Sequence, residues 1–135
     1  MPNASALDKK KVIQHLISFL EEELRDLPKN DANLVQKQEL ESLLVMYRFL
    51  PARDHEPTDP IVPTSLVTLQ IGSATTFAFI VPRGGGFITA VDGNPLQVLT
   101  PNSPLGEALL GRKTSDRVLV EIRGQKREYV IIASS

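Results

Sequence analysis

The chain has 135 residues, of which 15 are basic and 16 are acidic, and it contains no cysteine. A chain of this length forms one ordinary domain or two small ones, and it is too short for a large multidomain enzyme. The lack of cysteine excludes a disulfide framework, a thiolate metal site and a thiol nucleophile, and the near-zero net charge disfavours non-specific nucleic-acid binding as the main activity.

Glycine and proline divide the sequence into two halves. All eight glycines lie at Gly72 or later. Four of the ten prolines cluster just before that point, at Pro51, Pro57, Pro60 and Pro63. A half without glycine is typical of helices, and a half punctuated by glycine is typical of strands and turns. We therefore expect helices over residues 1–51, a proline-rich linker over 52–64 and a β-rich domain over 65–135.

The first half predicts two antiparallel helices. Asp8 can cap the first helix and Pro28 ends it, while Asn30 or Asp31 can cap a second helix that ends at Pro51. Apolar residues recur at spacings of three and four, which is typical of a short coiled coil. They are Ile13, Ile17, Leu20, Leu24 and Leu27 on the first helix and Leu40, Leu43, Tyr47 and Leu50 on the second. Because the connection is short, we expect a helical hairpin whose apolar seam thins toward the turn, where Asn33 and Gln36 replace leucine.

The second half predicts strands interrupted by one short helix. Alternating apolar and polar residues favour strands. The expected strands cover residues 65–71, 76–81, 87–91, 96–99, 117–123 and 128–133. Ser103 can cap the helix, Pro104 suits its first turn and Gly111 can end it. The predicted fold class is α+β: a helical hairpin followed by an antiparallel sheet with one short helix against it.

Patterns typical of catalytic sites are scarce. The only histidines, His15 and His55, are most simply read as solvated side chains. Residues 106–114 come close to a phosphate-binding loop, but Arg112 displaces the lysine by one residue and the glycines bracket a helix instead of preceding it. We therefore expect no enzymatic activity, no metal site and no cofactor.

Acidic residues gather around the predicted hairpin turn. Glu21, Glu22, Glu23 and Asp26 precede the turn and Asp31 follows it. The simplest interpretation is a solvated helix face with a capping residue. The alternative is that the rod presents Asp26 and Asp31, the candidate tip residues, to a distant Mg²⁺.

The N-terminal residues do not have the pattern of a signal peptide, because Gln14, His15 and Ser18 interrupt the apolar positions behind the basic cluster. The apolar runs are also too short to span a bilayer. We expect a cytoplasmic protein without a membrane partner.

Residues 99–118 resemble the C-terminal domain of the bacterial Gre-type transcription elongation factors. The resemblance rests on Asn102-Ser103-Pro104-Leu105, Ala108-Leu109-Leu110-Gly111, Lys113, Asp116 and Val118, with the last strand at residues 128–131 also similar. It extends more weakly over residues 65–99 and so covers about half the chain. It implies an FKBP-like fold for residues 65–135, with a helical hairpin in front of it.

The resemblance also implies RNA polymerase as the partner. In the family this domain docks at the rim of the polymerase secondary channel and the hairpin points into the channel, so that nucleic acid is contacted only indirectly. We predict that Asn102, Ser103, Pro104 and Leu105 form the polymerase contact, with an exposed Leu105 as its apolar anchor.

The hairpin turn departs from the pattern of the family's cleavage factors. Their tip has the form G-D-L-x-E-N-A-E-Y, in which an aspartate and a glutamate help hold a catalytic Mg²⁺. Asp31 matches the aspartate, but Leu34 stands three residues later instead of an acid, and the hairpin looks shorter. Both departures resemble the short-hairpin relative called regulator of nucleoside diphosphate kinase.

We therefore expect a polymerase-binding regulator that does not stimulate transcript cleavage. One alternative is a cleavage factor that uses Asp31 and Asp26. Another, from a different class, is a peptidyl-prolyl isomerase, which only the FKBP-like fold suggests.

Overall fold

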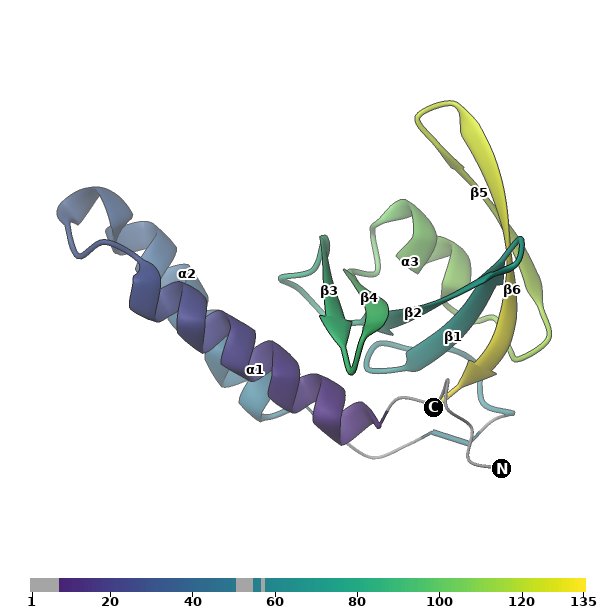
Figure 1. Cartoon of the computed structure of the whole chain (residues 1–135), viewed down its shortest axis with the longest axis horizontal. Coiled ribbons are helices and arrows are strands. Elements are labelled where there is room, and N and C mark those ends of the chain that lie inside the picture. The colour runs from purple at the N-terminus through teal and green to yellow at the C-terminus, as the bar shows by residue number, and fades with distance from the viewer. Residues whose placement is uncertain (1–7, 51–54, 57) are drawn as a thin grey trace. The chain divides into compact units, whose positions relative to one another are not determined.

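The computed structural model describes residues 8–50, 55–56 and 58–135 (Figure 1). These residues form two compact units. The first contains the helices that begin after Asp8, and the second runs from residue 55 to the C-terminus. The predicted boundary between residues 51 and 52 lies outside the described residues.

The first unit is a pair of helices joined by a short turn (Figure 1). Helix α1 (Lys9–Asp26) begins where the Asp8 carboxylate accepts a hydrogen bond from the backbone N–H of Lys10 at 3.1 Å, and it ends two residues before Pro28. A short 3₁₀ turn, η1 (Asp31–Asn33), leads into helix α2 (Leu34–Arg48). The predicted helical hairpin is confirmed.

The buried stripe of the hairpin is wider than the predicted seam. It comprises Val12, Ile13, Leu16 and Leu20 on α1 and Leu43, Leu44 and Tyr47 on α2. Ile17, Leu24, Leu27, Leu40 and Leu50 are only half-buried. Such a stripe is typical of helices in globular proteins, which bury more positions than a strict coiled-coil seam. Because α2 buries nothing before Leu43, the predicted thinning of the seam toward the turn is confirmed.

An ion pair on the hairpin surface also joins the two helices. Arg48 Nη2 of α2 lies 3.0 Å from Glu21 Oε2 of α1. Both side chains are about half exposed, so the pair contributes no more than about 1 kcal/mol.

The second unit is a six-stranded sheet with one short helix. The strands are β1 (Leu66–Ile71), β2 (Ala74–Ile80), β3 (Phe87–Val91), β4 (Asn94–Leu99), β5 (Arg117–Ile122) and β6 (Gln125–Ser134). Their order across the sheet is β3-β4-β2-β1-β6-β5, and helix α3 (Pro104–Leu109) lies between β4 and β5 in the chain. The predicted α+β fold class is confirmed.

One neighbouring pair of strands, β2 and β4, is parallel, which the prediction of an antiparallel sheet did not include. Strand β3 pairs only with β4 and forms an edge of the sheet. A tight turn at Asp92 and Gly93, both with positive φ, brings the chain back so that β4 lies between β3 and β2.

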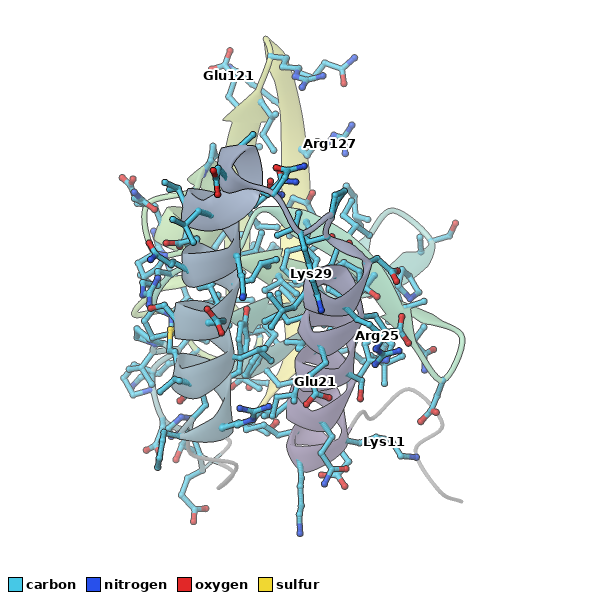
Figure 2. The ribbon with its side chains drawn as sticks, turned by 90° about the vertical axis from the view of Figure 1, so that its left-hand side faces the viewer. Lys11, Glu21, Arg25, Lys29, Glu121 and Arg127 are labelled. Atoms are coloured by element: carbon cyan, nitrogen blue, oxygen red, sulfur yellow. The ribbon has the colours of Figure 1, made fainter. Side chains whose placement is uncertain are left out.

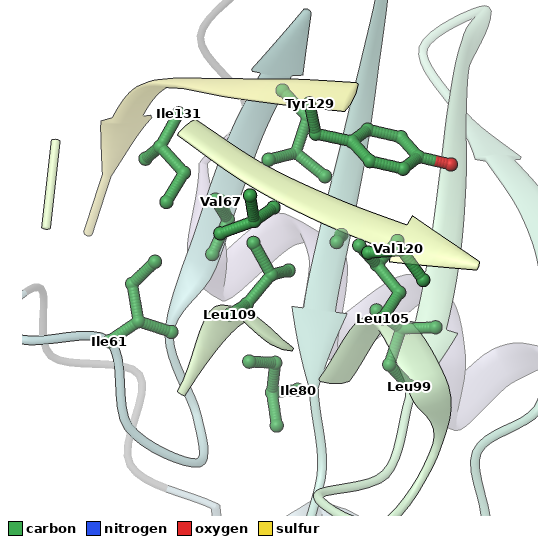
Figure 3. Close-up of a cluster of buried hydrophobic side chains, with 12 residues drawn as sticks. Ile61, Val67, Ile80, Leu99, Leu105, Leu109, Val120, Tyr129 and Ile131 are labelled. Carbon is green, nitrogen blue, oxygen red and sulfur yellow. The ribbon is translucent and has the colours of Figure 1, made fainter. Parts of the chain in front are cut away.

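The core of this unit lies between α3 and one face of the sheet (Figure 3). Strands β1 and β2 contribute Val67 and Ile80, strands β5 and β6 contribute Val120 and Ile131, and α3 contributes Leu109. Along β5, buried Val118 and Val120 alternate with exposed residues, as expected for a half-buried strand. The sheet and α3 therefore hold each other in place.

None of the helices formed by residues 8–50, 55–56 and 58–135 combines the length and apolar character needed to cross a membrane.

Candidate functional site

The turn that leads into α3 is built from the motif residues and is called here the α3 turn (residues 100–106). Ser103 Oγ accepts a hydrogen bond from the Gly106 backbone N–H at 3.1 Å and donates one to the Thr100 carbonyl at 2.8 Å. Thr100 Oγ1 in turn donates to Asn102 Oδ1 at 2.8 Å. The prediction that Ser103 caps the short helix is confirmed, and these bonds fix the turn before any partner arrives.

Gly106 is required by the close packing of this turn. A Cβ atom at this position would overlap the Thr100 carbonyl oxygen and approach the Ser103 hydroxyl. Gly106 also lies inside α3 instead of ahead of a helix, so residues 106–114 do not form a phosphate-binding loop. The sequence alone marked Gly106 only as part of that apparent loop.

The α3 turn exposes only part of the predicted contact. Asn102 and Pro104 are exposed and Ser103 is half-buried. Leu105 is only 3% exposed and belongs to the core beneath the sheet (Figure 3), so the prediction of an exposed Leu105 anchor is wrong. Its side chain lies on the same face of α3 as Leu109, four residues later, and both pack inward. That spacing was the signal that could have identified Leu105 as a core residue.

The hairpin tip places its acidic candidates on the surface. Asp26 is the last residue of α1 and Asp31 the first residue of η1, and both are exposed. The turn between them is held by asparagines. Asn30 Oδ1 accepts from the Asn33 backbone N–H at 3.1 Å, and Asn33 Nδ2 donates to the Pro28 carbonyl at 2.9 Å. The sequence predicts Asn30 or Asp31 as the cap of the second helix; Asn30 instead caps η1, and the bond made by the Asn33 side chain was not predicted.

The tip also carries apolar surface. An open hollow of about 380 Å³ is lined by Leu24, Leu27 and Leu34, with Lys29 and Lys37 among the polar residues beside them. Leu34 is 51% exposed, and the neighbouring Val35 is 78% exposed. Two apolar side chains therefore remain on the surface near the tip, outside the seam between the helices.

The two histidines, which the sequence predicts to be solvated, are both half-buried. His55 is half-buried with Nε2 3.3 Å from the Thr64 hydroxyl. Within the part of the chain that the structure describes, no three or more His, Asp or Glu side chains are grouped so as to hold a metal ion.

The aromatic side chains suggested for an isomerase pocket are mostly interior. Phe77 and Phe79 of β2 and Tyr129 of β6 are each no more than 3% exposed. Phe77 and Phe79 therefore belong to the core and cannot line an open pocket.

Several solved structures of transcription factors have a similar fold. Gfh1 from Thermus aquaticus is 15% identical in sequence, with 94% of each chain covered and a TM-score of 0.47. GreA factor homolog 1 (Gfh1) from Thermus thermophilus is 19% identical, with 94% of this chain and 87% of that chain covered and a TM-score of 0.45. The transcription elongation factor GreA/GreB from Nitrosomonas europaea is 19% identical, with 88% of this chain and 91% of that chain covered and a TM-score of 0.45.

No protein-family model matches the sequence, and neither does any curated protein.

Proposed function

We propose that this chain is an RNA polymerase-binding transcription regulator of the Gre type that performs no chemistry itself. The observation that carries the proposal is the α3 turn. Its sequence is the part that resembles the Gre factors, and its side chains bond to one another in a fixed conformation that leaves Asn102 and Pro104 exposed. A preformed contact of this kind binds without first having to order a loop.

The four residues of the predicted contact have different roles in this proposal. Asn102 and Pro104 touch the polymerase directly, because their side chains are exposed. Ser103 and Leu105 are positioning residues: the Ser103 hydroxyl bonds the turn to itself, and buried Leu105 attaches α3 to the sheet.

In this proposal the tip of the helical hairpin lies in the polymerase secondary channel. A carboxylate helps hold Mg²⁺ only at coordination distances of about 2.1 Å, usually alongside other oxygen ligands. The tip offers exposed Asp31, but apolar Leu34 stands where a second acid is needed. We therefore expect the hairpin to occupy the channel without stimulating cleavage.

One observation favours the cleavage factor as a second candidate. Asp26 and Asp31 are both exposed and flank the same turn. An isomerase gains no such support, because Phe77, Phe79 and Tyr129 are buried.

Binding to immobilised RNA polymerase tests the proposal. The double variant Asn102→Ala/Pro104→Ser keeps both Ser103 hydrogen bonds and loses one exposed bond, from Thr100 Oγ1 to Asn102 Oδ1, so the thermal midpoint should fall only slightly. We expect its dissociation constant to rise about tenfold, as for a moderately important interface residue pair. Ser73→Ala, which changes an exposed residue in a different turn, is the matched control. Equal binding by the wild type and the double variant would exclude the α3 turn as the contact.

A further inference from the structure

Strand β5 forms an edge of the sheet and pairs only with β6. The two strands are joined by a two-residue turn at Arg123 and Gly124, both with positive φ, so the flanking pair Ile122 and Gln125 exchanges hydrogen bonds. Bonded and non-bonded pairs alternate along an antiparallel ladder. The backbone N–H and C=O groups of Leu119 and Glu121 therefore point away from β6.

These outward backbone groups are available for a further strand. Among the described residues, no other backbone group forms a hydrogen bond with Leu119 or Glu121. Leu119 is 64% exposed and adds apolar surface to this edge. An edge strand with free ladder groups and an exposed apolar side chain is a template for pairing with another chain.

Basic side chains lie at both ends of this edge. Residues 117–128 carry four basic and two acidic side chains, a net charge of +2. Arg117 at the start of β5 makes only a long, exposed ion pair of 3.9 Å with Glu128. At the other end, Ile122, Arg123, Gln125 and Arg127 line an open hollow of about 410 Å³. Figure 2 shows the Glu121 and Arg127 side chains projecting outward from the β5–β6 hairpin.

We propose that β5 binds an extended acidic segment of a partner protein as an added strand. The backbone of the segment pairs with Leu119 and Glu121, an apolar side chain covers Leu119, and carboxylates reach Arg117 at one end and the hollow with Arg123 and Arg127 at the other. This binding mode combines main-chain hydrogen bonds for affinity with side-chain contacts for specificity. It does not depend on the function proposed above.

A nucleic-acid ligand fits this surface less well. Residues 117–128 include no aromatic side chain on which a base could stack, and phosphates would not use the free N–H and C=O groups as a strand does. The charge favours an acidic ligand, and the strand edge favours a polypeptide.

Fluorescence anisotropy on the full chain tests the proposal, with a labelled octapeptide of glutamates that carries valines at positions 4 and 6. The two valines then share one face of the added strand, and glutamates at both ends can reach the basic side chains. Leu119→Pro removes an outward-facing N–H and replaces the leucine side chain by a smaller apolar ring, and proline is tolerated on the free side of edge strands. We expect this variant to weaken binding about tenfold, while Leu119→Val, which keeps the N–H, binds like the wild type. Arg123→Glu/Arg127→Glu should weaken binding by a similar factor and reduce its dependence on salt.

Two further probes keep the test independent of whether the proline variant folds. The same octapeptide with N-methylated valines cannot form the strand ladder, and we expect it to bind at least about tenfold more weakly. Equal binding of the methylated and unmethylated peptides, or tighter binding of a short DNA duplex than of the octapeptide, would overturn the proposal.

Discussion

Gly106 lies where the backbone of α3 passes directly over the Thr100 carbonyl. A methyl group at this position would overlap that carbonyl oxygen, which belongs to the backbone and cannot rotate away. The neighbouring Ser103 hydroxyl, which fixes the same turn, is also within reach of the added atom. The absence of a side chain at Gly106 therefore allows the turn that carries Asn102 and Pro104 to pack closely against α3.

We predict that Gly106→Ala lowers the free energy of unfolding by about 1–3 kcal/mol, the usual cost of forcing an extra carbon into a packed site. Urea unfolding of both proteins measures the difference. Glu107→Ala is the matched control, because Glu107 is exposed on the next residue of the helix and its loss should change stability by less than about 0.5 kcal/mol. Equal stability of Gly106→Ala and the wild type would show that a methyl group fits at this position, which would contradict the close packing described above.

Tyr47 on α2 is fully buried, and its hydroxyl finds no hydrogen-bond partner among the described residues. Burial raises the pKa of the Tyr47 hydroxyl from its ordinary value of 10.0 to about 12, because the ionised form is penalised in the interior. The folded chain thus holds this proton more tightly than the unfolded chain. The resulting contribution to stability is complete below pH 10 and is lost as the pH rises toward 12.

We therefore predict that Tyr47→Phe is at least as stable as the wild type at neutral pH, with a gain of up to about 1 kcal/mol from removing an unpaired buried hydroxyl. Its stability should fall less steeply than that of the wild type above pH 10, the ordinary pKa of tyrosine. All other titrating groups are shared by the two proteins, so the difference between their unfolding curves isolates Tyr47. Parallel curves through the alkaline range would contradict the assignment.

At the scale of elements, most helix and strand positions could be predicted because their signals are local. Asp8 and Pro28 bound the first helix, and alternation of buried and exposed residues marks β5. The parallel pairing of β2 with β4 could not be predicted, because it depends on where β3 settles in the sheet and no local residue pattern records that.

The site was predicted less completely than the fold. Ser103 was identified as a cap because its bond to Gly106 spans only three residues. The position of Leu105 in the motif predicts a surface residue, whereas its spacing of four from Leu109 indicates a core residue. Both leucines belong to the core. The Asn33 bond to Pro28 escaped prediction because it depends on the shape of the completed turn.

The hydrogen bond from Asn33 Nδ2 to the Pro28 carbonyl closes the turn of the hairpin. Asn33→Ala removes the side-chain hydrogen bond to the Pro28 carbonyl, and we predict a loss of about 0.5–1 kcal/mol because the exposed carbonyl regains water. Thermal unfolding followed by the helical circular dichroism signal measures it. Gln36→Ala, an exposed substitution in the first half of α2, should not destabilise the chain, since alanine is the better helix former. If Asn33→Ala and Gln36→Ala have the same thermal midpoint, the Asn33 hydrogen bond does not stabilise the turn.

At the scale of the whole molecule, we propose that the sheet unit binds the polymerase and that the hairpin unit occupies its secondary channel. The sheet unit holds the α3 turn, with Asn102 and Pro104 exposed, and the hairpin unit ends in a tip with Asp31 and apolar Leu34. Such a protein would compete with cleavage factors for the polymerase channel while supplying too few carboxylates to replace them.

Transcript cleavage in stalled, backtracked RNA polymerase complexes tests this central claim most directly. We expect the protein to bind these complexes without shortening the transcript. In excess, it should suppress the cleavage that an added cleavage factor stimulates. A Mg²⁺-dependent shortening of the transcript that appears with the wild-type protein and disappears with Asp31→Ala would contradict the account and identify the chain as a cleavage factor.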